Sequence, residues 1–238
     1  MDQLEFIIHS LPNLLFGYPT ARPGGLVLSL LLGVSGVVCG FVLALPIGVL
    51  GASQRRWLRG AATLYIRIIR GLPLVLLLLI IHTIGSRAVI GVNFAPLTSA
   101  AIALLLYASA YQAEIIRGGL RAVPPTQLEA AQASGLGYLD AWRFVILPQA
   151  LRAMLPAFAG QAIAIFKDTS FVMILGVGDL MMVGRTIGNA GNEQYFLALY
   201  GTIGLLYFSV AYTMSQLARP FERKLTAARR LWLTYESA

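Results

Sequence analysis

Three long stretches of the chain contain no charged residue and are mostly apolar: Leu26–Leu50, Phe94–Ala113 and Gln194–Ala218. A helix needs about 20 apolar residues to cross the hydrocarbon core of a bilayer, so each stretch is long enough to span it. Two shorter apolar runs reach that length only with polar neighbours: 71–86 extended back to Gly60, and 153–166 extended to Pro148 or past Lys167. The pattern predicts an all-α integral membrane protein with five transmembrane helices.

The composition agrees with this class. The chain has 238 residues, 58% of them hydrophobic and 12% charged, whereas soluble domains are about 45–50% apolar and about 25% charged. The length allows one domain. Asp2 and Glu5 stand where a signal peptide would be basic, so no cleaved signal is expected, and residues 4–16 indicate a peripheral or interfacial segment.

The net charge of +8 is distributed unevenly among the loops. With the N-terminus outside, most Lys and Arg residues lie on the inner side, within 55–70, 117–152 and 219–230. The outer side then holds Arg22, Arg87, Lys167 and Arg185. This is the positive-inside bias of membrane proteins. The basic residues therefore orient the chain with its C-terminus in the cytoplasm, and they require no nucleic-acid partner.

The first span carries small residues every four positions: Gly36, Gly40, Ala44, Gly48 and Ala52. Small residues at this spacing let two helix backbones approach closely in lipid. Two interpretations follow. The ribbon packs against another helix of the same bundle, or it forms the seam of a homodimer.

The segment between the third and fourth spans is polar and rich in helix-forming residues, unlike its surroundings. Thr126 and Glu129 have the spacing of a capping box, and Gly135 stops the short helix. A second amphipathic helix is expected over 138–147, with Asp140 and Arg143 spaced to pair. Such short helices do not fold alone. The pattern predicts a cytoplasmic hairpin that docks into a groove on a partner protein.

Few ionisable residues fall within the spans, and intramembrane charges are candidates for function. Glu114 lies near the inner end of the third span, either on a transport path or in an i, i+3 pair with Arg117. His82 lies near the outer end of the second span, either packed or on the path. After the fourth span, charged residues and glycines interrupt an apolar run from Lys167 to Arg185. Broken helices of this kind are typical of transporters.

The sequence contains no recognisable catalytic constellation or metal-binding motif. Its only cysteine, Cys39, excludes a disulfide framework. A phosphate-binding P-loop needs Gly-Lys followed by Ser or Thr, but Lys167 follows Phe166 and Lys224 follows Arg223. We expect a non-catalytic chain that binds no cofactor and no metal. If ATP drives transport, the ATPase is a separate subunit.

The polar segment resembles the EAA loop of bacterial ABC-importer permeases, whose pattern is Glu-Ala-Ala, three residues, Gly, nine residues and Ile-x-Leu-Pro. The matching residues occur at the full spacing: Glu129-Ala130-Ala131, Gly135 and Val145-Ile146-Leu147-Pro148. Val145 replaces the usual Ile. The complete register inside a five-span chain is a specific signal, whereas a capping box alone is not.

Further motifs narrow the resemblance to polar amino-acid permeases similar to the histidine, glutamine and glutamate systems. They are Arg70-Gly71-Leu72-Pro73-Leu74, Ala110–Gly119, Leu147–Arg152, Lys167-Asp168-Thr169-Ser170 and Gly176–Leu180. The resemblance implies the type I ABC importer permease fold. It also implies a peripheral or periplasmic segment over 1–24, a transmembrane domain over 25–224 with the EAA loop at about 118–148, and a cytoplasmic tail over 225–238.

The resemblance implies a multi-pass subunit of the bacterial cytoplasmic (inner) membrane that translocates a polar amino acid. Its partners would be a second permease chain (homo- or heterodimer), a dimer of ATPase subunits that binds ATP and Mg, an external solute-binding protein and membrane lipid. ATP binding would close the ATPase dimer and move the coupling helix around 129–135. The residues expected in coupling are Glu129, Ala130, Ala131, Gly135, Val145, Leu147 and Pro148.

The candidate residues of the solute path are Lys167, Asp168, Thr169, Ser170, Met173, His82 and Glu114. Burying either charge of an α-amino acid unpaired is costly. Asp168 would therefore accept from the ammonium group, while Thr169, Ser170 and backbone N–H groups would hold the carboxylate. Alternatively, Lys167 and Asp168 only fix the bent outer end of the fourth span.

Two other functions share this composition. A secondary transporter driven by an ion gradient would work without an ATPase, but the EAA register and the lack of an internal repeat count against it. An ABC permease for a non-amino-acid solute keeps the mechanism and changes only the cargo.

Overall fold

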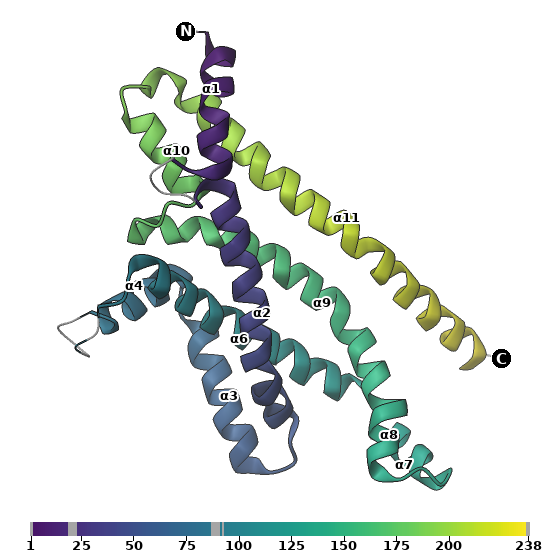
Figure 1. Cartoon of the computed structure of the whole chain (residues 1–238). Coiled ribbons are helices and arrows are strands. Elements are labelled where there is room, and N and C mark those ends of the chain that lie inside the picture. Colours follow the sequence, from purple (N-terminus) through teal and green to yellow (C-terminus); the bar gives the residue numbers. More distant parts are fainter. Residues whose placement is uncertain (1, 19–22, 87–90, 92, 237–238) are drawn as a thin grey trace.

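The computed structural model describes residues 2–18, 23–86, 91 and 93–236, with side chains described as far as Pro220. Within these residues every regular element is a helix (Figure 1). The elements are α1 (Gln3–Phe16), α2 (Gly25–Ala52), α3 (Arg56–Gly71), α4 (Leu74–Ile84), α6 (Pro96–Ala122), α7 (Pro125–Ala133), α8 (Tyr138–Ala141), the π-helix η2 (Trp142–Ile146), α9 (Leu147–Asp168), the 3-10 helix η3 (Thr169–Leu175), α10 (Leu180–Asn189), the 3-10 helix η4 (Glu193–Tyr195) and α11 (Phe196–Glu236). The predicted all-α class is confirmed.

Four stretches of the described chain are long and apolar enough to cross a membrane as helices: Gly25–Ala52, Pro96–Ala122, Tyr138–Leu175 and Glu193–Pro220. The pair α3 and α4 passes the same test of length and composition only when the two helices are taken together across a bend of 105°, which brings the total to five if the pair is one span. The bend falls at Leu72 and Pro73, because a proline ring disfavours the helical conformation of the residue before it. The five predicted spans therefore correspond to four helical runs and one sharply broken pair.

Helices α2 and α6 form the most extensive helix pair of the bundle. The small residues of α2 face α6: a Cβ on Gly40 would lie 2.8 Å from the Cβ of Ala108, and one on Gly48 would lie 2.6 Å from the Cβ of Ile116. Such contacts require glycine because the two backbones approach so closely. The ribbon packs within the chain, so its interpretation as a homodimer seam is wrong.

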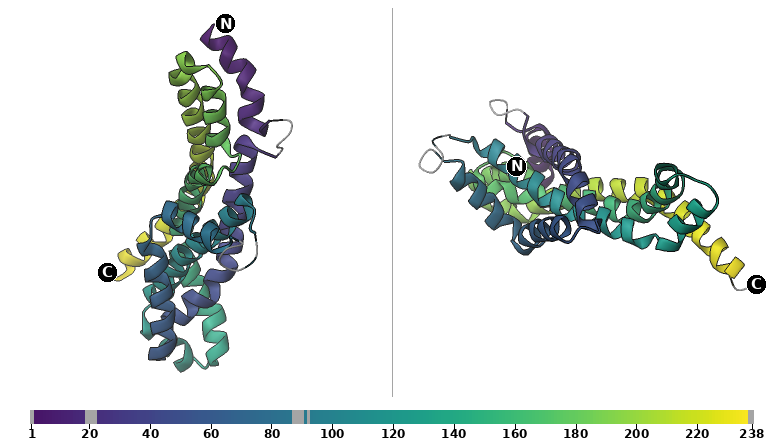
Figure 2. Two further views of the ribbon diagram at one scale, coloured as in Figure 1. Left: turned by 90° about the vertical axis from the view of Figure 1, so that its left-hand side faces the viewer. Right: turned by 90° about the horizontal axis from the view of Figure 1, so that it is seen from below.

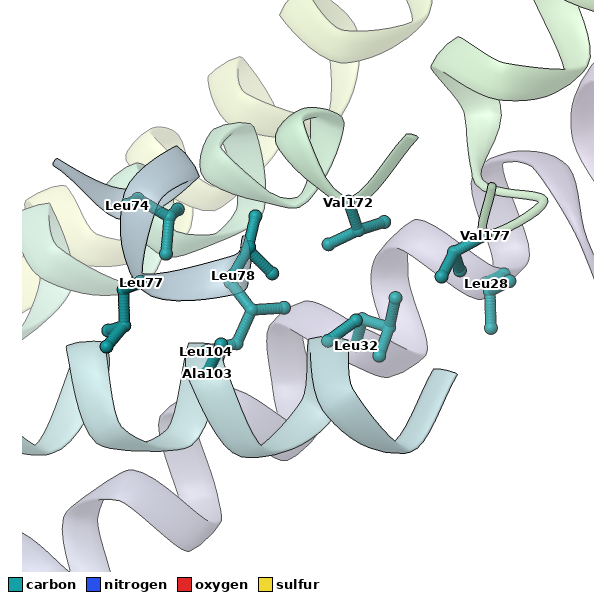
Figure 3. Packing of buried hydrophobic residues seen from close by; sticks show 10 residues of the cluster. Leu28, Leu32, Leu74, Leu77, Leu78, Ala103, Leu104, Val172 and Val177 are labelled. Atoms are coloured by element: carbon teal, nitrogen blue, oxygen red, sulfur yellow. The ribbon is translucent and has the colours of Figure 1, made fainter. Parts of the chain in front are cut away.

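Helix α4 packs against α6 and η3, and α2 joins the same cluster (Figure 3). Leu77 and Leu78 of α4 contact a buried cluster that includes Leu32 of α2, Leu104 of α6 and Val172 of η3. The cluster joins elements far apart in sequence. It fixes the broken second span against the end of the fourth.

The N-terminal segment, interpreted from sequence as peripheral, forms the packed helix α1. It lies with α10 and the start of α11 at the end of the molecule opposite α7 and α8 (Figures 1 and 2). Phe6 is buried and stacks on Tyr195, with ring centroids 4.4 Å apart. Of the four basic residues assigned to the outer side, Arg22 and Arg87 lie outside the described residues.

Candidate functional site

The EAA segment forms a helix and a tight turn at one end of the bundle (Figure 1). Helix α7 ends at Ala133, and Gly135 follows with φ of +88°. The backbone N–H of Leu136 donates to the carbonyl of Ala131 at 3.2 Å, which closes the last turn. A residue with a Cβ is strained at this φ, so Gly135 is required by the backbone even though open space surrounds it.

The predicted capping box is wrong. Pro124 is the N-cap of α7, no side chain caps the helix, and Pro125 occupies its first turn. Proline is favoured at this position because its φ is already helical and its missing N–H needs no partner. The helix therefore starts before Thr126, and Thr126 lies inside its first turn. The N-cap is Pro124, which has no side chain that can cap the helix.

Most of the EAA segment is exposed, including Glu129, Ala130 and Gly135, while Ala131 is buried. Of the remaining predicted coupling residues, Leu147 is exposed and Val145 and Pro148 are half-buried. Large apolar side chains are exposed beside them, namely Tyr138, Leu139 and Phe144. Sequence reasoning named the motif but missed these three, although they lie on the expected amphipathic helix. An exposed apolar surface of this kind is typical of an interaction site.

The second helix of the hairpin is not separate from the fourth span. Helix α8, η2 and α9 form one run, in which the N–H of Leu147 reaches the carbonyl of Trp142 in a wider π-helical turn. In a regular α-helix, the ring of Pro148 would clash with the carbonyl of Phe144. Phe144 lies within the π-helical turn, whose wider geometry accommodates the proline. The predicted Asp140–Arg143 pair is absent among the described side chains. The Arg143 guanidinium instead lies 5.4 Å from the ring centroid of Phe144.

A polar contact ties α7 to the start of α9. The side-chain amide of Gln149 donates to the side-chain oxygen of Gln127 at 3.3 Å and to the carbonyl of Val145 at 3.0 Å. Gln149 belongs to the Leu147–Arg152 motif, but its sequence position alone did not indicate its partner. The contact links the exposed segment to the span that follows.

The predicted pair between Glu114 and Arg117 is confirmed. Arg117 donates to both carboxylate oxygens of Glu114, with Nε 2.8 Å from Oε2. Arg70 reaches the same carboxylate at 3.9 Å, and its guanidinium lies 4.9 Å from the ring centroid of Tyr111. These residues line a cavity of about 390 Å³. Glu114 is therefore held by two arginines from different helices.

The Lys167–Ser170 motif marks the change from the α-helix α9 to the 3-10 helix η3, and the helical run stops only after Leu175, at Gly176. The predicted interruption at this motif is therefore a change of helix type. Lys167 is exposed, Asp168, Ser170 and Met173 are half-buried, and Thr169 is fully buried. The Thr169 hydroxyl donates to the carbonyl of Phe166 at 2.7 Å. The hydroxyl proton of Thr169 is therefore already donated to a hydrogen bond within its own helix.

The remaining candidates are separated. His82 Nδ1 is 3.0 Å from the buried Ser99 hydroxyl, which fits a packed residue. The charges of Asp168 and Arg70 both act electrostatically on the Tyr107 hydroxyl, and Arg70 lies over the ring of Tyr111, whose hydroxyl accepts from that of Tyr107 at 3.3 Å. His82 shares none of these interactions.

Asp179 belongs to the Gly176–Leu180 motif but was not among the predicted site residues, and it is fully buried just after the fourth span. Its carboxylate accepts from the N–H groups of Met181 and Met182, at 3.2 and 2.9 Å, and so caps α10. The Ser29 hydroxyl accepts from the N–H of Leu180 at 3.2 Å. Burial raises the pKa of Asp179 to about 6. These contacts fix α10 against the start of α2.

A five-span helical chain with an exposed EAA hairpin and a broken fourth span is a membrane permease subunit. A family model described as "Binding-protein-dependent transport system inner membrane component" matches residues 36–225. The chain belongs to this family, so the ABC-importer permease resemblance is confirmed.

Relatives of the chain are named as amino-acid permeases. It is 32% identical to the "Probable glutamine ABC transporter permease protein GlnP" of Bacillus subtilis, covering 85% of this chain and 92% of that one. It is 33% identical to the "Glutamate/aspartate import permease protein GltK" of Escherichia coli O157:H7, covering 92% and 96%. A chain of the "Crystal structure of an amino acid ABC transporter with histidines" has a TM-score of 0.81 and 32% identity, covering 94% of this chain and 99% of that one.

Proposed function

We propose that this chain is the transmembrane subunit of an ABC importer for a polar amino acid, and that it couples a separate ATPase to the solute path. The observation that supports this most is the continuous helical run over 138–175, which starts at the exposed hairpin and passes through the Lys167–Ser170 motif. A helix is stiff over this length. Movement of the hairpin is therefore transmitted along α9 to the outer end of the span.

The hairpin is the docking site for the ATPase dimer in this proposal. Exposed apolar residues such as Leu139 and Phe144 would enter a groove on the ATPase, beside Glu129 and Ala130 of α7. ATP and Mg bind to that partner, and the permease itself is non-catalytic. Closure of the ATPase dimer shifts the permease only if the hairpin makes different contacts in the two states.

The solute path runs past Tyr107 in this proposal, between Arg70 and Asp168. An α-amino acid needs an acceptor for its ammonium group and donors for its carboxylate. Asp168 supplies the acceptor. Arg70 supplies the donors better than Thr169 does, because a guanidinium has five N–H groups and the Thr169 hydroxyl donates to Phe166. Glu114 and Arg117 then position Arg70 rather than bind the solute.

The orientation follows from the distribution of arginines. The N-terminus and α10 face outside, toward the solute-binding protein, and α7 lies in the cytoplasm. We retain the division into an outer segment 1–24, a transmembrane domain 25–224 and a cytoplasmic tail 225–238. A second permease chain, a copy or a homologue, completes the path in the inner membrane.

The test is uptake of a labelled amino-acid panel into proteoliposomes that hold this chain, its co-purifying ATPase and its binding protein. ATP is enclosed and no ion gradient is applied. We expect uptake that requires ATP. Gradient-driven uptake by this chain without the ATPase would overturn the proposal.

A pair of glycine variants tests the role of the hairpin in the same assay. Gly135→Ala places a Cβ at φ of +88°, whereas Gly137→Ala does so at φ of −63°, an ordinary conformation. We expect Gly135→Ala to reduce ATP-dependent uptake about five- to thirtyfold, which corresponds to the cost of about 1–2 kcal/mol of the left-handed conformation. Equal uptake by the two variants would contradict the role assigned to the turn.

A further inference from the structure

An arginine-lined hollow lies on the surface between α3 and the C-terminal end of α6. Its volume is about 550 Å³. Its polar lining consists of Arg56, Arg59, Thr63, Arg67, Arg117 and Arg121. These six residues are called the α3 groove below. The hollow shares Thr63, Arg67 and Arg117 with the cavity that contains Arg70 and Glu114, so the two are adjacent.

The spacing of these residues along α3 places them on one face of the helix. Arg56, Arg59, Thr63 and Arg67 follow one another at intervals of three or four residues, which is the repeat of one helix face. Ala62 and Ile66, on the flank of this face, are buried in the bundle, whereas Arg56 and Arg67 are exposed. The arginine face is therefore directed away from the core by the packing of the helix.

The positive charge of the groove is not balanced by protein groups. Arg117 is paired with Glu114, and Arg121 donates to the carbonyl of Gly51 at 3.0 Å. The guanidinium groups of Arg56, Arg59 and Arg67 form no ion pair or side-chain hydrogen bond with the described residues. Five guanidinium groups around one hollow repel one another, and an anion placed between them would relieve that repulsion.

An apolar stripe runs beside the arginines on α3. Trp57, Leu64 and Ile68 lie at intervals of seven and four residues, with exposed fractions of 69%, 60% and 53%. Tryptophan is enriched where a membrane meets water. A small soluble anion would need only the arginines. The stripe indicates a ligand with an apolar part that lies along the same helix.

We propose that the α3 groove binds the phosphate of an anionic phospholipid, whose acyl chains lie along Trp57, Leu64 and Ile68. Guanidinium groups pair with phosphate oxygens through two parallel hydrogen bonds. Basic pockets between membrane helices on the cytoplasmic side bind anionic head groups in this way. The site does not depend on the solute that is transported. The lipid is assigned to the inner leaflet from the orientation of the chain, which is the one step that rests on the proposed function.

The test uses the full-length chain in nanodiscs and Trp57 as the reporter. The other tryptophans are replaced by Trp142→Phe and Trp232→Phe. Quenching of Trp57 is compared between brominated phosphatidylglycerol and brominated phosphatidylcholine at equal mole fraction. We expect stronger quenching by phosphatidylglycerol, with the preference weakened by added salt because exposed charges are screened.

Variants test whether the preference for phosphatidylglycerol comes from the α3 groove. Arg59→Gln with Arg67→Gln should remove it, since each basic residue near a membrane surface contributes about a fivefold preference. Arg59→Lys with Arg67→Lys should retain most of it, because the charge is kept, and this also shows that the region folds. Arg185→Gln, an exposed arginine on α10 at the other end of the molecule, should leave the preference unchanged.

Three results would overturn the proposal. The first is equal quenching of Trp57 by both lipids. The second is a preference abolished by millimolar inorganic phosphate, which would make the groove a site for a soluble anion. The third is an unchanged lipid preference in the Arg59→Gln, Arg67→Gln variant together with less co-purifying ATPase, which would make the groove a protein interface.

Discussion

The side-chain amide of Gln149, in the first turn of α9, donates to the side-chain oxygen of Gln127 in α7 across 3.3 Å. This hydrogen bond joins the exposed hairpin to the helix that ends at the Lys167–Ser170 motif. The same amide donates to the carbonyl of Val145, inside the π-helical turn. The contact therefore fixes the angle between α7 and the fourth span.

Gln149→Leu removes this bond with little change in side-chain volume. We expect fewer amino-acid molecules transported per ATP hydrolysed, by about fivefold, since a net hydrogen bond contributes about 1 kcal/mol. The measurement is uptake and ATP hydrolysis in the same proteoliposomes. Gln132→Leu, an exposed glutamine of α7, is the control. An unchanged ratio in Gln149→Leu would show that the contact does not transmit movement.

Gly48→Ala tests the close approach of α2 to α6. The new Cβ would lie 2.6 Å from the Cβ of Ile116, and overpacking of this kind costs about 1–3 kcal/mol. We expect a lower midpoint of thermal unfolding in detergent. Gly204→Ala adds the same atom where no neighbour lies within 4 Å, and should raise the midpoint because alanine favours helix by about 1 kcal/mol. Similar midpoints for both variants would contradict the packing argument.

Asp168→Asn tests direct contact with the solute. If the carboxylate accepts from the ammonium group, the KM for uptake should rise about tenfold or more, because a hydrogen bond to a charged group contributes about 1.5–3 kcal/mol. Lys167→Gln is the comparison. If Asp168 and Lys167 only fix the end of the span, both variants should change Vmax and neither should change KM. Unchanged KM and Vmax in Asp168→Asn would exclude the direct contact.

Asp179 predicts a pH dependence of stability. Burial raises its folded-state pKa to about 6 from an ordinary value of 3.8, so the folded protein holds this proton more tightly than the unfolded chain does. The resulting stabilisation is fully present below about pH 4 and is lost as the pH rises through about 6, with a total of about 2–3 kcal/mol. Unfolding midpoints should therefore fall between about pH 4 and pH 7 by this contribution.

Asp179→Asn is the control for that titration. Asparagine still caps a helix, so α10 keeps its N-terminal hydrogen bond, but the side chain no longer ionises. We expect the step near pH 6 to disappear from the unfolding midpoints. A step of the same size in Asp179→Asn would assign the titration to another group.

The elements predicted from sequence are those that depend on local pattern. Apolar runs are sufficient to identify a bilayer span, because each helix satisfies its own backbone in lipid. The Glu114–Arg117 pair follows from helix spacing alone. The stop at Gly135 follows from the conformation that glycine allows. The change from α9 to η3 at Lys167–Ser170 was visible as charge within an apolar run.

The capping box shows where local pattern is ambiguous. Thr126 and Glu129 have the correct spacing, but Pro125 also favours a helix start and places it before Thr126. Two local signals competed, and the sequence alone did not rank them. The continuous run through Pro148 was missed for a similar reason, because a π-helical turn accommodates a proline that usually ends a helix.

By itself, the sequence determined the class of protein, the number of spans, the hairpin and the family resemblance, because each depends on residues close together in the chain. Only the tertiary structure decided which face of α2 meets α6, that Gln149 reaches Gln127, that Arg70 lies over the ring of Tyr111, and that arginines of α3 and α6 share one groove. These contacts join residues distant in sequence. They are set by how helices pack against one another, which the pattern along a single helix does not specify.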